Sequence, residues 1–204
     1  MNREPGAPAT VTLASKSAAR AAILKGAGVD FATADSGVDE ALLKEGLLAR
    51  DANPAQVAAA LAREKAVAVS RVRAGLVIGA DQTLDFEGRL YDKPPNLSTA
   101  AERLRALRGR THALHAAVAV ARDGQLVWET LSSAELIMRD FSDHFLSAYM
   151  DTEGQELLSS VGAYRLEGLG VQLFSEIRGD YFTILGLPLT GLLDLLRREG
   201  ALMA

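Results

Sequence analysis

The stretch Gly75-Leu-Val-Ile-Gly-Ala-Asp-Gln82 sets the fold of this 204-residue chain. Leu76 to Ala80 is a short apolar run after a glycine, which is typical of a strand buried in a sheet. Asp81 follows at the predicted carboxyl end of that strand, where α/β folds place their ligands. A carboxylate there can bind a metal or accept a proton from water. On this element alone, an aspartate that merely closes a turn is the better supported interpretation.

Predicted strands and helices alternate on both sides of this stretch. Before it, the pattern predicts strands over 11–14 and 29–34, helices over 18–26 and 55–72, and an acidic turn over 35–40. After it come a hairpin over 84–91, paired strands over 113–121 and 126–139, and helices over 98–107, 142–152 and 188–198. Ser98 is the expected cap of the first of these helices. The alternation predicts a mixed α/β fold.

Composition excludes several classes of protein. Apolar residues make up 49% of the chain, enough for a substantial core, and the formal net charge is -4. A general nucleic-acid binder needs a surplus of Lys and Arg, so we expect no nucleic-acid partner. The absence of cysteine excludes disulfides, thiolate catalysis and cysteine-based zinc sites.

No apolar run approaches the roughly 20 residues that span a bilayer, so we expect no membrane partner and a cytoplasmic location. Residues 1–10 are polar and contain two prolines, which predicts a flexible tail before a single domain over 11–204. His112 and His115 are three apart on a predicted strand, so they face opposite sides of the sheet. All three histidines are expected to be core or solvated residues.

Other polar motifs suit a phosphate ligand, although each has an ordinary structural interpretation. Ser15-Lys-Ser-Ala-Ala-Arg20 joins a strand to a helix start, where backbone N–H groups favour an anion, but the same residues suit a simple helix cap. Lys93 precedes two prolines and projects from a stiff loop, as a surface lysine also would. Asp39-Glu40 and Lys65 suit either a site or a solvated surface.

Taken in order, these segments resemble the successive motifs of the Maf family. The resemblance runs from about residue 11 to residue 198. The matching segments are Leu13 to Arg20, Val38 to Glu40, Leu61 to Ala66, Ile78 to Gln82, Lys93-Pro94, Gly109 to His112 and Gly186 to Pro188. The resemblance implies two lobes around a long mixed β-sheet with a central cleft, an architecture related to inosine triphosphate pyrophosphatases.

The resemblance also implies an activity. Members hydrolyse a nucleoside triphosphate to the monophosphate and pyrophosphate, use magnesium or manganese, and tend to be homodimers. They are linked to the clearing of non-standard nucleotides and to cell division. By position, Asp81 matches the family's proton acceptor, and Glu40 and Asp81 would hold the metal. The positions matching phosphate-binding residues are Ser15, Arg20, Lys65 and Lys93.

Three positions sort bases in this family, and here they are Ala19, Gln82 and Glu167. Gln82 and Glu167 resemble the branch that acts on 7-methyl-GTP. A carboxylate at Glu167 can accept hydrogen bonds from the N1 and amino donors of guanine and favours a methylated, positively charged ring. Ala19 replaces an aromatic residue or arginine, which removes a stacking partner.

Two departures from the family pattern stand out. Ser17-Ala18 replaces the usual Ser-Pro, and Ser159-Ser160 replaces the usual Asp-Lys. One alternative is a non-catalytic nucleotide-binding regulator of cell division, against which Glu40, Lys65, Asp81 and Lys93 count. Another is a phosphatase of the haloacid dehalogenase type, which needs an aspartate where Thr83 stands.

Overall fold

A single mixed sheet organises the protein. The computed structural model describes residues 9–203, which confirm the predicted α/β class. The strand order is β2-β1-β3-β5-β6-β7, and β4 pairs with β3 alone. β1 is parallel to β2 and β3, whereas the pairs β3–β5, β5–β6 and β6–β7 are antiparallel. The strands are β1 (Val11–Ala14), β2 (Ala32–Thr33), β3 (Leu76–Phe86), β4 (Arg89–Tyr91), β5 (Thr111–Arg122), β6 (Gln125–Met138) and β7 (Phe174–Arg178).

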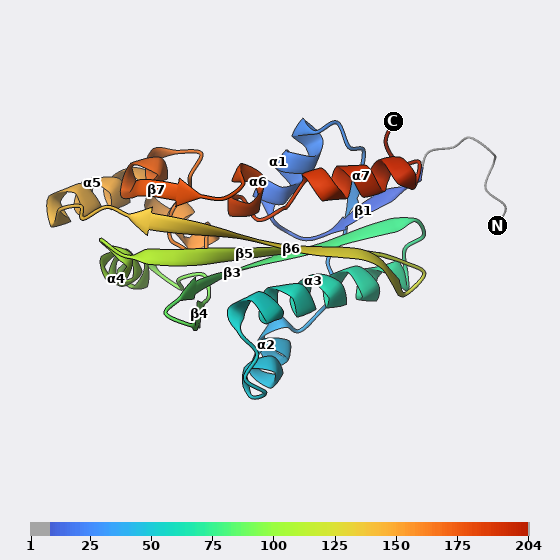
Figure 1. Ribbon diagram of the computed structural model, residues 1–204, viewed down its shortest axis with the longest axis horizontal. Coiled ribbons are helices and arrows are strands. Elements are labelled where there is room, and N and C mark those ends of the chain that lie inside the picture. The colour runs from blue at the N-terminus through green and yellow to red at the C-terminus, as the bar shows by residue number, and fades with distance from the viewer. Residues whose placement is uncertain (1–8, 204) are drawn as a thin grey trace.

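Helices cover both faces of the sheet and one end of it. Figure 1 shows α3, with α2 beyond it, on one face, and α1, α6 and α7 on the other, while α4 and α5 lie at one end. No helix in the described range is long and apolar enough to cross a membrane. The helices are α1 (Ala18–Gly26), α2 (Glu40–Leu48), α3 (Pro54–Ser70), α4 (Leu97–Leu107), α5 (Asp143–Glu153), α6 (Tyr181–Ile184) and α7 (Thr190–Arg198), with 3-10 turns at Gly154–Ser159 and Leu169–Leu173.

β3 is longer than the sequence predicted, and Asp81 lies in its middle rather than at its end. The polar residues after Ala80 stay in the strand because the antiparallel ladder to β5 continues to the pair Asp85↔Ala113. The parallel ladder to β1 nevertheless stops at the pair Ala14↔Gly79. Asp81 therefore lies just beyond the end of β1, where a strand-to-helix loop leaves the sheet.

Other boundaries also differ from expectation. The predicted strand over 29–34 is only two residues long in β2, and the acidic turn leads into α2, which begins at Glu40 and which the pattern missed. β7 was not predicted. Asn96 rather than Ser98 caps α4, because its side chain accepts the backbone N–H of Thr99 at 2.9 Å. Of Ser15 and Ser17, either of which could cap the helix over 18–26, Ser17 does so, and Ser142 caps the helix predicted to start there.

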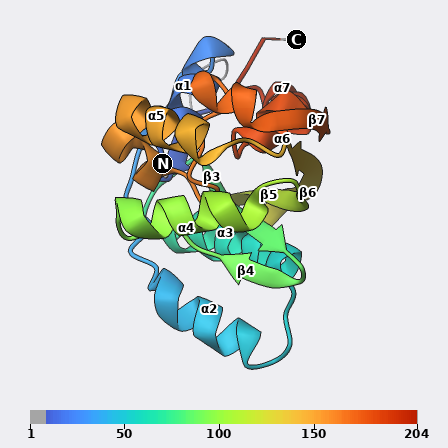
Figure 2. The ribbon, with the colours of Figure 1, turned by 90° about the vertical axis from the view of Figure 1, so that its left-hand side faces the viewer.

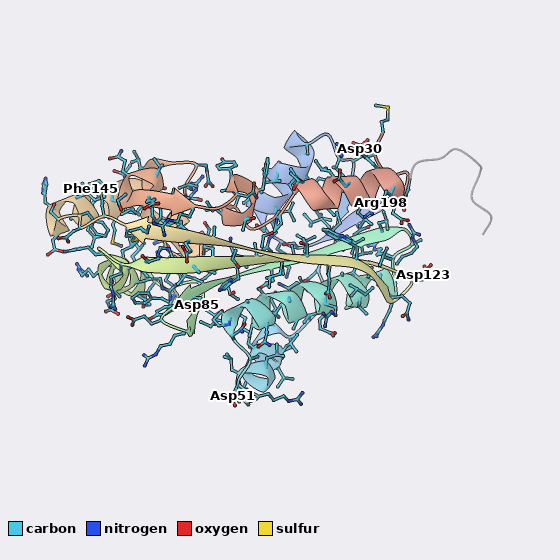
Figure 3. All side chains as sticks on the ribbon, in the orientation of Figure 1. Asp30, Asp51, Asp85, Asp123, Phe145 and Arg198 are labelled. Atoms are coloured by element: carbon cyan, nitrogen blue, oxygen red, sulfur yellow. The ribbon has the colours of Figure 1, made fainter. Side chains whose placement is uncertain are left out.

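Both predicted hairpins are confirmed, and their turns explain the register. Glu87-Gly88 and Asp123-Gly124 each have two consecutive positive φ angles, the geometry that matches the twist of antiparallel strands. Figure 3 labels Asp123 at one end of the long β5–β6 hairpin and Asp85 near the opposite end of β3. The long strands thus run through most of the molecule.

The core forms two main clusters along these strands. The first packs Leu104 and Leu107 of α4 and Leu146 of α5 against one end of the sheet. The second packs α1 and α7 against the other, including Leu24 and Leu196. Most of the predicted tail lies outside the described residues, but the Ala9 backbone N–H donates to Gly200 O at 3.1 Å, so residue 9 belongs to the folded part.

A glycine lets α3 approach β3 closely. A Cβ at Gly79 would lie 2.2 Å from Ala62 O and 2.5 Å from Ala66 N, so only glycine fits there. Small residues continue this contact, since Ala58, Ala62 and Ala66 pack on alanines of β5. The close approach brings the side chains of α3 directly over the centre of β3.

Candidate active site

Lys65 joins two carboxylates from different elements. Its Nζ lies 2.6 Å from Asp81 Oδ1 and 2.8 Å from Glu40 Oε1. Lys65 projects from α3 onto β3 at the close contact described above, and Glu40 reaches it from the first turn of α2. The sequence proposed these three residues from separate motifs, and the fold brings them to one point.

Burial makes this cluster costly to disrupt. The side chains of Lys65 and Asp81 are 6% and 11% exposed, whereas that of Glu40 is 44% exposed. A buried ammonium needs charged partners, because removing one partner leaves a charge without compensation in a poorly solvated place. Glu40 faces solvent and is therefore the more accessible of the two carboxylates.

Arg20 lies beside the cluster and is fixed by the backbone. Its Nε donates to Gly186 O at 2.9 Å, and one terminal nitrogen donates to Ala80 O at 2.9 Å and to Ser15 Oγ at 3.2 Å. Desolvation lowers the pKa of the guanidinium, while the charges of Asp81 and Glu40 oppose that shift. The same carboxylates thus help to keep Arg20 charged.

Lys93 completes the positive side of the site. The pKa of its ammonium is lowered, first by partial desolvation and then by repulsion from Arg20, and Asp81 and Glu40 oppose the shift. Lys93 is exposed to solvent and forms no ion pair within residues 9–203. A second cation held near Arg20 without an acid of its own suits a polyanionic ligand.

A pocket of about 250 Å³ opens next to Ser15, between the β1–α1 loop and the end of β2. It is lined by Ser15 to Ala18, Ala21, and Thr33 to Asp35. Ser17 caps α1 and accepts the Arg20 backbone N–H at 3.4 Å. Ala18 does not disturb this start, so the missing proline of the family motif leaves the helix intact.

The base-sorting candidates occupy different surroundings. Both Nε2 hydrogens of Gln82 point to backbone carbonyls, with 3.0 Å to Thr183 O and 2.9 Å to Ile184 O. Ala19 is exposed on α1. Glu167 is exposed in the glycine-rich segment and pairs with Arg165 at 3.6 Å, and within residues 9–203 no hydrogen bond or ion pair joins it to the Lys65 cluster.

The two carboxylates fit a divalent cation. Glu40 and Asp81 contact the same ammonium, so the two carboxylates lie close together and can share a cation bound beside Lys65. Magnesium is commonly held by one or two carboxylates together with phosphate oxygens of the substrate. Within the described range no group of three or more acidic or histidine side chains forms a ready-made metal cage.

None of the three histidines has a hydrogen bond or ion pair to this cluster within residues 9–203. His112 and His115 lie on opposite faces of β5, with His112 buried against Tyr164 and His115 bonded to Ser133 Oγ at 2.7 Å.

The two serines that replace the usual Asp-Lys form local hydrogen bonds with the backbone. Ser159 Oγ donates to Glu156 O, and Ser160 Oγ accepts the Gly162 N–H.

Sequence reasoning missed the parts of the site made by backbone and by outer ion pairs. The carbonyls of Gly186, Thr183 and Ile184 hold Arg20 and Gln82. Every residue has a backbone carbonyl, so a sequence does not show which carbonyls accept from a side chain. Lys44 of α2 pairs with Asp92, the residue before Lys93. Only the proximity of Asp92 to the Lys93 motif could have drawn attention to it.

The mixed α/β sheet agrees with the family comparison. The chain belongs to the Maf family: the model described as Maf-like protein matches residues 10–199. A nucleoside triphosphate pyrophosphatase of Caulobacter vibrioides is 60% identical over 94% of this chain and 96% of its own. A 7-methyl-GTP pyrophosphatase of Rhizobium meliloti is 47% identical over 94% of this chain and 97% of its own.

Proposed function

We propose that this protein hydrolyses nucleoside triphosphates to the monophosphate and pyrophosphate. The observation that carries the proposal is the contact of solvent-facing Glu40 and buried Asp81 with the same buried ammonium of Lys65, with Arg20 and Lys93 close by. The names of the relatives, nucleoside triphosphate pyrophosphatase and 7-methyl-GTP pyrophosphatase, support the same reaction.

In this proposal each side chain has a role set by its charge. Arg20, Lys65 and Lys93 offset the roughly four negative charges of the triphosphate. Ser15 donates a hydroxyl hydrogen bond to a phosphate oxygen. Glu40 and Asp81 are the residues that would hold magnesium or manganese, and the bound ion would supply charge neutralisation and a more acidic water.

Asp81 is the proposed general base. It takes a proton from water while the water oxygen attacks the α-phosphorus in line with the leaving group. The bond from that phosphorus to the α–β bridging oxygen then breaks, and pyrophosphate leaves with the electron pair. Lys65 fixes the orientation of the Asp81 carboxylate through the 2.6 Å contact.

Phosphate detection tests the reaction directly. Purified protein with magnesium is given GTP, 7-methyl-GTP, UTP and dTTP, and orthophosphate is measured with and without added inorganic pyrophosphatase. We expect signal only when the pyrophosphatase is present. Signal without it would indicate a phosphatase, and no signal with any substrate would favour a nucleotide-binding regulator.

Guanine recognition by Glu167 is a further part of the proposal, with 7-methyl-GTP as the favoured substrate. Support comes from the exposure of the Glu167 carboxylate, whose one ion-pair partner in residues 9–203 is Arg165. Gln82 has both amide hydrogens engaged by backbone carbonyls and keeps its oxygen as an acceptor.

Glu167→Gln should weaken selection for guanine, because a neutral amide loses the charge that favours a methylated ring. We expect kcat/KM for 7-methyl-GTP relative to UTP to fall by roughly tenfold, which corresponds to about 1.4 kcal/mol. The matched control is Glu156→Gln, which changes the other acid beside Arg165. An unchanged ratio in the Glu167 variant argues against this assignment.

We also propose a cytoplasmic homodimer. Within residues 9–203, β7 pairs with β6 only from Glu135 to Met138, so the preceding part of that edge has no partner strand. Leu126, Val127 and Leu131 are exposed along β6 and supply apolar surface there. Light scattering that gives the mass of a single chain at micromolar concentration would contradict the dimer.

A further inference from the structure

Arg103 of α4 connects two loops that lie far apart in the sequence. One of its terminal nitrogens donates to Asp92 O and, at 2.5 Å, to Val161 O. Asp92 immediately precedes Lys93, and Val161 begins the glycine-rich segment that carries Glu167. A single side chain thus binds both the loop that carries the proposed phosphate-binding Lys93 and the segment that carries the proposed base-sorting Glu167.

The guanidinium is itself held in place. It lies over the ring of Tyr91, with 5.1 Å from its central carbon to the ring centroid. It is partly buried, and burial lowers its pKa while the negative charge of Asp92 opposes the shift. Its Nε has no hydrogen-bond partner within the described residues. The side chain therefore has its position set by β4 and by the two carbonyls.

The chain after Asp92 transmits this position to Lys93. Pro94 and Pro95 fix their own φ angles and restrict the residues before them, so the loop moves as a stiff unit. The Asp92 side chain is held separately by Lys44 of α2, the helix that begins with Glu40. Asp92 is thus fixed twice, through its backbone by α4 and through its carboxylate by α2.

We propose that Arg103 is a positioning residue that sets the Lys93 loop relative to the glycine-rich segment without touching the substrate. The inference rests on the proposed function. Loss of Arg103 removes the link between the two loops and leaves Asp92 held only through its carboxylate, so Lys93 and Glu167 are no longer kept in fixed relative positions. Substrate binding and base discrimination should then weaken together, while Asp81 and Lys65, held by α3 and β3, remain in place.

Steady-state kinetics of Arg103→Met tests this coupling. Methionine keeps an apolar stem against Tyr91 and removes both hydrogen bonds. We expect KM to rise roughly tenfold for 7-methyl-GTP and roughly threefold for UTP and kcat to change little for either, so that the ratio of kcat/KM between them moves toward one. Arg103→Lys offers an ammonium to the same two carbonyls, which both accept from one nitrogen, but its side chain is shorter, so its KM should be intermediate.

The control is Arg105→Met on the same helix, because Arg105 is exposed and its ion pair with Asp143 is 3.8 Å long. It should leave KM and the ratio of kcat/KM unchanged.

Melting temperatures distinguish a positioning role from a purely structural one. An Arg103→Met protein that melts at a lower temperature but keeps the wild-type KM and ratio overturns the inference. No turnover by the wild type overturns the proposed function and this inference with it, whereas an active wild type with an unaffected Arg103→Met overturns the inference alone.

Discussion

At the scale of single residues, the site depends on a charge balance around Lys65. Two carboxylates contact one ammonium at 2.6 and 2.8 Å, and two further cations lie near them. The sequence could predict these residues because each belongs to a recognisable motif. It could not predict that Lys65 would be the common partner, because that depends on how closely α3 approaches β3.

Asp81→Asn should abolish most turnover and leave the fold nearly intact, because the change removes a charge but little volume. We expect kcat to fall by roughly 10²- to 10⁴-fold, the range for loss of a general base. The free energy of unfolding in urea should fall by less than about 3 kcal/mol, because Glu40 still compensates Lys65.

The matched control is Asp85→Asn, on the same strand and four residues away. That carboxylate contacts His115 rather than Lys65, at 3.5 Å. It should keep wild-type kcat. A well-folded Asp81→Asn protein with the wild-type rate refutes the proposed base.

His112 should make stability depend on pH. Burial lowers its pKa to about 4, against roughly 6.5 in the unfolded chain. The unfolded state therefore binds a proton first, and stability is complete above pH 6.5 and is lost as the pH falls toward 4. From pH 7.5 to 5 this residue should lower the free energy of unfolding by about 2 kcal/mol.

Urea titrations at the two pH values measure this loss. His112→Gln removes the titrating group and keeps a polar partner for Tyr164, whose hydroxyl lies 2.7 Å from His112 Nε2. The difference between the two pH values should shrink by about the same 2 kcal/mol. An equally steep pH dependence in the variant would assign it to other groups.

At the scale of elements, the sequence predicted those with strong local signals. The long helix α3 has an Asn53–Gln56 capping box and a proline at its first position, and both hairpins have clear turn residues. α2 was missed although Leu43 and Leu47 lie one helical turn apart, because the helix is short, contains Gly46 and buries no side chain fully. Figure 2 shows it standing beyond α3, away from the sheet. β3 was predicted too short because pairing with β5 overrides its polar residues.

Gly79→Ala tests the contact between α3 and β3. The added methyl group meets backbone atoms of α3 at 2.2 and 2.5 Å, so the helix must move away. We expect a loss of at least about 2 kcal/mol in the free energy of unfolding. Turnover should also fall, because Lys65 and Asp81 are on the two separated elements.

Gly46→Ala is the matched control, since nothing lies within 4 Å of a Cβ there and the residue is inside α2. Alanine has the higher helix propensity, so this variant should be more stable by about 0.5–1 kcal/mol. A Gly79→Ala protein with wild-type stability would mean that the close packing has room to adjust.

At the scale of the whole molecule, two core clusters share three long strands. β3, β5 and β6 contribute side chains to both, as Leu84 and Leu114 do to the first and Ile78 and Val120 to the second. The class of fold followed from the alternation of elements. The division of the core did not, because it depends on which helices pack at which end of the sheet.

Shared strands should make the clusters unfold together. Leu104→Ala leaves a cavity in the first cluster and should cost about 2–5 kcal/mol. Trp128, the one tryptophan of the chain, packs against the second cluster. The loss in free energy of unfolding that tryptophan fluorescence reports should equal the loss that far-ultraviolet circular dichroism reports. A tryptophan transition that stays at the wild-type midpoint would show that the clusters unfold independently.

The carbonyls that hold Arg20 and Gln82 belong to Thr183, Ile184 and Gly186, which follow those two residues in the chain by 101 residues or more. A chain that is still being synthesised therefore contains the acids and lysines of the site long before it contains these three carbonyls. A fragment that ends before residue 183 would therefore keep those acids and lysines but lack three of the four backbone carbonyls that accept from Arg20 and Gln82, and we expect it to hold a nucleotide loosely.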